Sequence, residues 1–169
     1  FALIEPEGYT FNIPPRLKSE NLRSLYLRHS GGKGDHEFDL SYLSYIIPDT
    51  KIESIGFWDT KKKRLSGDSI GIIASSPNLR ELDIRGCNLD DPSQVIGFVT
   101  ALRSPNCALT TLVMTLHNQT TNLTHEMIAG AVNENTSLTK LILTDSHLGK
   151  GFHFKMRSPF QKLGVSTIT

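Results

Sequence analysis

The chain lacks the long apolar runs, the paired cysteines and the charge excess that mark several common classes of protein. It has no stretch of about 18 apolar residues, so the sequence predicts no membrane span. Its two cysteines, Cys87 and Cys107, form no CxxC pair, which favours reduced thiols and a cytoplasmic location over a disulfide scaffold, with a single bridge as the alternative. The 18 basic and 17 acidic side chains nearly cancel. Because a non-specific nucleic-acid binder needs a positive excess to neutralise phosphates, we expect no nucleic-acid partner.

Motifs of catalysis and of metal binding are missing as well. The six histidines are scattered, with no HxxxH pair, so the sequence predicts no metal site. No nucleophile elbow is present, and the glycine-rich segment 31–35 lacks the spacing of a phosphate-binding loop. We therefore expect no enzymatic activity, no cofactor and no small-molecule substrate.

What the sequence does have is one short pattern that recurs along the chain. An apolar residue is followed by two variable residues, a second apolar residue, one variable residue and a third apolar residue. The clear copies are Leu22-Leu25-Leu27, Ile52-Ile55-Phe57, Leu79-Leu82-Ile84, Leu109-Leu112-Met114 and Leu138-Leu141-Leu143. Their first members are spaced by 30, 27, 30 and 29 residues, and Phe160-Leu163-Val165 is a degenerate sixth copy. Such a constant spacing indicates a repeat protein.

Each copy predicts a strand that is followed by a helix. Alternate side chains of a strand share a face, so Leu25 and Leu27 point the same way, and stacked copies bury that face in a parallel sheet. Between the strands, apolar residues recur at three- and four-residue spacings over 38–47, 69–74, 93–102 and 124–132, which predicts helices. Asp90-Asp91-Pro92 is a start signal for the third of these helices.

A repeat of about 28 to 30 residues with a full helix resembles the ribonuclease-inhibitor-like subfamily of leucine-rich-repeat proteins. Ser104-Pro-Asn-Cys107-Ala-Leu109 resembles helix-to-strand junctions in the repeat regions of nucleotide-binding immune receptors. The resemblance covers residues 20–150 and implies an α/β fold, a solenoid of about five to six repeats with a curved parallel sheet on its concave side and helices on its convex side. We expect residues 1–20 to form an N-terminal cap, 21–150 the repeats, and 151–169 a degenerate last repeat or a C-terminal cap.

The predicted register places one residue from each strand in each of three columns on the face away from the helices. The outermost column contains Arg28, Trp58, Arg85, Thr115 and Thr144, the central one Tyr26, Gly56, Asp83, Val113 and Ile142, and the third Ser24, Ser54, Glu81, Thr111 and Lys140. Trp, Tyr and Arg are the residue types most enriched in binding hot spots. We therefore predict a partner-binding site at Tyr26, Arg28, Trp58, Glu81, Asp83 and Arg85.

Trp58 is expected between Arg28 and Arg85, with a notch at Gly56 beside its ring. Two other interpretations are open. The arginines could stack on Trp58 and pair with Asp83 and Glu81 for purely structural reasons. A register slip of one residue would instead send Trp58 into the core. The fourth and fifth predicted strands place mostly β-branched residues on this face, at Thr111, Val113, Thr115, Ile142 and Thr144. These residues either form a second exposed surface for a partner or are present because β-branched residues favour strands.

The resemblance implies a protein-binding module that recognises a macromolecular partner through its concave face, as the sensing region of an innate immune receptor does. Three other roles fit the same sequence: a stand-alone bacterial effector, the substrate-recognition domain of a ubiquitin ligase, and a structural piece that stacks on further repeats. Fold alone does not choose among them.

Overall fold

A computed structural model describes residues 2–4, 21–28, 43, 47–58, 67–85, 87, 89, 92–115, 122–144 and 166–168 of the chain. Its strands are β1 (Ala2–Ile4), β2 (Ser24–Arg28), β3 (Ser54–Trp58), β4 (Glu81–Ile84), β5 (Thr111–Thr115), β6 (Lys140–Thr144) and β7 (Ser166–Ile168). Its helices are the short 3-10 helix η2 (Ile47–Asp49) and the α-helices α2 (Gly67–Ala74), α3 (Pro92–Arg103) and α4 (Asn122–Glu134).

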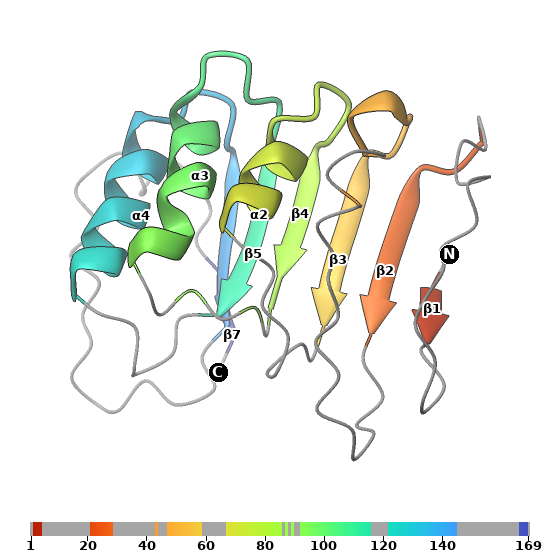
Figure 1. Cartoon of the computed structure of the whole chain (residues 1–169). Coiled ribbons are helices and arrows are strands. Elements are labelled where there is room, and N and C mark those ends of the chain that lie inside the picture. Colours follow the sequence, from red (N-terminus) through yellow and green to blue (C-terminus); the bar gives the residue numbers. More distant parts are fainter. Residues whose placement is uncertain are drawn as a thin grey trace.

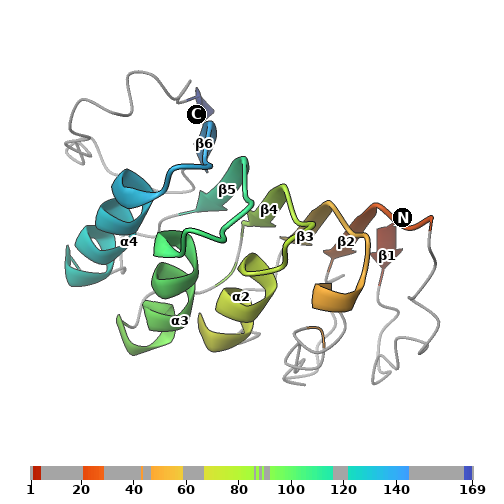
Figure 2. The ribbon, with the colours of Figure 1, turned by 90° about the horizontal axis from the view of Figure 1, so that it is seen from above.

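The strands form one sheet whose spatial order is their order along the chain, and each neighbouring pair is parallel. The three α-helices lie side by side in one layer against one face of this sheet (Figures 1 and 2). Each helix carries the chain from the end of one strand back to the start of the next, as parallel pairing requires. The predicted α/β class with a parallel sheet is therefore confirmed.

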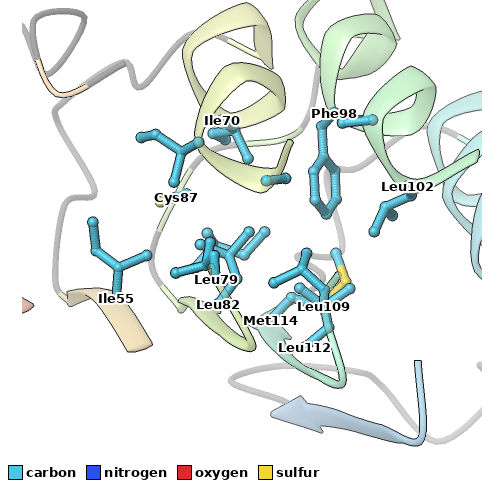
Figure 3. Close-up of a cluster of buried hydrophobic side chains, with 14 of the residues drawn as sticks. Ile55, Ile70, Leu79, Leu82, Cys87, Phe98, Leu102, Leu109, Leu112 and Met114 are labelled. Atoms are coloured by element: carbon cyan, nitrogen blue, oxygen red, sulfur yellow. The ribbon is translucent and has the colours of Figure 1, made fainter. Parts of the chain in front are cut away.

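The core lies between the sheet and the helix layer and is built from the recurring apolar positions. The pairing aligns Leu25, Ile55, Leu82, Leu112 and Leu141 across adjacent strands. All five are buried, and so are the residues that open the pattern at Ile52, Leu79, Leu109 and Leu138. Ile70, Phe98 and Leu102 project from the helices onto these strand residues (Figure 3). Burial of branched side chains on this scale is the main force that holds the two layers together.

Neighbouring segments are also joined just before each strand begins. The carbonyl oxygens of Arg23, Glu53, Arg80 and Thr110 each accept hydrogen bonds from two successive N–H groups of the next segment, at 2.7–3.0 Å. Further on, the amide of Asn78 donates to the carbonyl of Thr50 at 2.8 Å. These bonds satisfy backbone groups that the strand ladder leaves unpaired, so they keep the first residues of neighbouring strands in register.

The predicted helices over 69–74, 93–102 and 124–132 are confirmed, each within two residues of α2, α3 and α4. The helix predicted over 38–47 lies largely outside the described residues, where Leu43 is helical and η2 begins at Ile47. Cys87 and Cys107 are buried thiols that form no disulfide. Residues 2–4 and 166–168 pair with β2 and β6, so they occupy the outer edges of the five-stranded centre. The remainder of the predicted caps and the degenerate copy at 160–165 lie outside the described residues.

Candidate interaction surface

The face of the sheet that points away from α2, α3 and α4 carries the central column of the predicted site, and no helix in the described ranges covers it (Figure 2). The pairing places Tyr26 beside Gly56, Gly56 beside Asp83, and Asp83 beside Val113. This is the predicted register. The alternative in which the strand slips by one residue is wrong, because Phe57 is 0% exposed and packs in the core.

Tyr26 lies across Gly56 on this face. A Cβ atom added to Gly56 would be 2.8 Å from Cε1 of Tyr26 and closer still to Cδ1, and no side chain fits there unless the ring moves. The hydroxyl of Tyr26 shares a hydrogen bond of 2.7 Å with the hydroxyl of Ser54. The notch predicted at Gly56 is therefore wrong, because the aromatic ring from the neighbouring strand fills it.

Asp83 and Arg85 form an ion pair at the end of β4. The carboxylate of Asp83 accepts hydrogen bonds from the backbone N of Arg85 at 3.1 Å, from its Nε at 3.0 Å and from its Nη2 at 2.6 Å. Asp83 is 3% exposed, whereas the side chain of Arg85 is 41% exposed. Asp83 was predicted as a partner contact, but its burial makes it the group that holds Arg85 in place.

Two more residues of the predicted site, Glu81 and Tyr26, interact electrostatically with Arg85. The hydrogen bonds from Arg85 to Asp83 raise the pKa of the guanidinium above its ordinary value and outweigh desolvation, which lowers it. The negative charges of Asp83 and Glu81, together with Tyr26, add to the rise in pKa. Tyr26 on β2 and Glu81 and Asp83 on β4 therefore lie near Arg85, which follows β4, and the pairing of arginine with acidic neighbours has a structural role.

The backbones of Arg28 and Trp58 pair with each other at the ends of β2 and β3, as predicted. The pairing of β3 with β4 ends at Gly56 and Asp83, and β4 itself ends at Ile84. Arg85 is thus not a ladder partner of Trp58, and the placement of the Trp58 side chain between two arginines stays a prediction. The side chains of Arg28 and Trp58 lie outside the described part of the structure.

Strands β5 and β6 present little free surface at the centre of this face. Val113 and Thr115 are buried, and Thr111 and Ile142 are half-buried. The interpretation of these positions as a second exposed apolar surface is therefore wrong at Val113 and Thr115. Among the side chains of this face that the structure describes, the accessible charged groups are Glu81, Arg85 and Lys140.

Comparisons with known proteins add no relative to this description. No protein-family model, curated protein or solved structure matches the chain. Within the described ranges, no three His, Cys, Asp or Glu side chains gather as a metal site would require. The helices described here are all too short or too polar to cross a bilayer.

Ser54 and Gly56 belong to the site although the prediction named neither as a site residue. One signal was present in the sequence: Gly56 is the only glycine within the five apolar patterns, and it lies opposite Tyr26 in the predicted register. A glycine in a strand beside an aromatic residue often indicates that the ring covers the backbone. Ser54 carried no comparable signal.

Proposed function

We propose that the chain is a protein-binding module built as a leucine-rich-repeat solenoid of the ribonuclease-inhibitor-like kind, without enzymatic activity. The observation that carries the proposal is the strand register, in which positions 27 to 30 residues apart become lateral neighbours in strand after strand. The repeated carbonyl contacts before each strand support it, because they join equivalent points of successive segments.

The expected curvature follows from the widths of the two layers. Strands lie about 4.8 Å apart, whereas packed helices lie about 8–10 Å apart. A stack that has strands on one side and helices on the other bends toward the strands, which makes the sheet the concave side. The concave face then carries Tyr26, Glu81 and Arg85, and a partner that binds there contacts several strands at once.

The partner on this face is a protein, recognised through a patch that contains the ring of Tyr26 and side chains of both charges. The ring of Tyr26 is fixed by Gly56 and Ser54, and Arg85 is fixed by Asp83. Fixed side chains lose little conformational entropy on binding, so they suit a binding surface. The buried, reduced state of Cys87 and Cys107 supports a cytoplasmic setting.

Affinity capture with matched variants tests the proposal. Trp58→Ala combined with Glu81→Lys changes the concave face and leaves the Asp83–Arg85 pair intact, and Thr136→Lys in the exposed loop between α4 and β6 is the control. Proteins held by the wild-type chain and by the control should be lost from the double variant, provided that all three proteins unfold at the same temperature. Retention by the double variant, or equal loss from the control, contradicts the assignment.

A further inference from the structure

The outward side of the helix layer has an unusual composition for a surface. Surface helices normally present many charged side chains to water. Here α2, α3 and α4 carry a single lysine or arginine among them, Arg103, although the whole chain has 18 such residues. Arg103 is engaged, since its Nε lies 2.9 Å from a carboxylate oxygen of Glu134.

Large apolar side chains occupy the outward positions instead. Ile72 on α2 is 47% exposed, Ile96 on α3 is 54% exposed and Leu123 on α4 is 56% exposed. Each helix thus contributes one branched apolar residue to the side that faces away from the sheet. Single exposed apolar residues are ordinary, but three on adjacent helices with few charges between them form a patch.

The three helices pack against one another, and the contact between α2 and α3 is made next to two of these side chains. A Cβ atom added to Gly71 of α2 would lie 2.5 Å from the backbone C and O of Gly97 in α3. Ile72 follows Gly71 and Ile96 precedes Gly97, so this backbone contact brings the turns that carry the two isoleucines side by side. At the other end of the layer, the amide of Asn135 donates to the carbonyl of Leu102 at 2.6 Å and holds α4 against α3.

Among the described residues of the three helices, acidic side chains outnumber basic ones, with Asp68, Glu126 and Glu134 against Arg103. Asp68 lies one turn before Ile72, and Glu126 lies three residues after Leu123, so each shares a helix face with its apolar neighbour. Both carboxylates are on exposed residues. Over its described residues, the outward face of the helix layer therefore combines exposed apolar side chains with a net negative charge.

We propose that this helix-layer patch, formed by Ile72, Ile96 and Leu123 with Asp68 and Glu126, is a second docking surface that takes a protein segment with apolar side chains flanked by lysine or arginine. Charge complementarity selects this occupant. A second copy of the chain seated symmetrically on the same patch would bring like carboxylates together. An anionic membrane surface or a nucleic acid would meet the same repulsion.

Panning a display library of random 12-residue peptides on the full chain tests the proposal without assuming a partner. Clones that bind the wild-type chain are counter-screened against Ile72→Asn/Ile96→Asn, with Asn133→Ala on the exposed side of α4 as the matched control. We expect clones rich in apolar residues plus Lys or Arg that bind the double variant at least tenfold more weakly and bind the control unchanged. Glu126→Lys should weaken the same clones, and it keeps the apolar residues in place.

Three results would overturn the proposal: no clone that distinguishes the double variant, clones that are neutral or acidic, or binding to phosphatidylserine vesicles that depends on Ile96. The milder pair Ile72→Ala/Ile96→Ala, which favours helix, repeats the counter-screen if the asparagine variant unfolds at a lower temperature. The concave-face variant Trp58→Ala/Glu81→Lys should bind these clones normally, so a failure here is separate from a failure of the proposed function.

Discussion

The contact between Gly56 and Tyr26 makes a quantitative prediction. The backbone of Gly56 has a conformation that L-residues adopt, so Gly56→Ala meets no backbone strain and by itself should stabilise the fold by about 0.5–1 kcal/mol. The new methyl group overlaps the ring of Tyr26, and the ring has to move. Moving it breaks the hydrogen bond to Ser54, worth about 1 kcal/mol. It also exposes on the order of 40 Å² of ring surface, worth about 1 kcal/mol.

We therefore expect Gly56→Ala to lower the free energy of unfolding by about 1–1.5 kcal/mol in the wild-type chain. In the Tyr26→Ala background the new methyl group meets only Cβ of Asp83, at an ordinary contact distance of 3.5 Å, and the change should raise the free energy of unfolding by about 0.5 kcal/mol. The double-mutant cycle then gives a coupling energy of about 2 kcal/mol.

Denaturant unfolding of the four proteins measures this coupling, with the slope m required to stay constant across the set. A coupling energy below about 0.5 kcal/mol would refute the reasoning, because it would mean that the ring does not cover Gly56. Tyr26→Phe is a useful addition to the cycle. It keeps the ring and removes only the hydroxyl, so Gly56→Ala should remain destabilising in that background.

Three further predictions concern stability. Arg85→Ala should destabilise the fold by about 2 kcal/mol, because it leaves the buried carboxylate of Asp83 without its ion-pair partner. Asp83→Ala should cost less, because the guanidinium of Arg85 that it leaves behind faces water. Equal effects of the two changes in denaturant unfolding would contradict this. Asn135→Ala removes the side-chain hydrogen bonds that join the end of α4 to α3 and to the loop before β6, so it should cost about 2 kcal/mol, against under about 0.5 for the exposed control Asn133→Ala. Leu112→Ala opens a cavity in the core and should cost about 2–5 kcal/mol; a change below 1 kcal/mol in calorimetry would show that the site collapses.

The sheet and its register were predictable because the apolar pattern carries two periods at once. The two-residue alternation of Leu25 and Leu27 defines the buried face of a strand, and the constant spacing to Ile55 and Leu82 defines which residues pair. The helices were predictable for the same kind of reason, since residues such as Val95 and Phe98 recur at helical spacing and are buried.

The side-chain arrangement of the candidate site was less predictable. Asp83 reads as an exposed residue from its position on the far face, but the turn after Ile84 brings the guanidinium of Arg85 back over it. The ring of Tyr26 was expected beside Gly56 and lies across it. Both outcomes depend on rotamers and on where β4 ends, and the spacing of apolar residues contains neither.

The order of the strands has a consequence for how the chain is made. Each strand pairs with the strands immediately before and after it in sequence, so no strand waits for a partner from a distant part of the chain. On a ribosome, β3 finds β2 already outside the exit tunnel, and β4 then finds β3. From β2 to β6 the loop that closes at each step is 27 to 30 residues long, so the entropy cost of adding a strand does not grow with the length already synthesised. The nascent chain is thus able to fold strand by strand in the order of its translation.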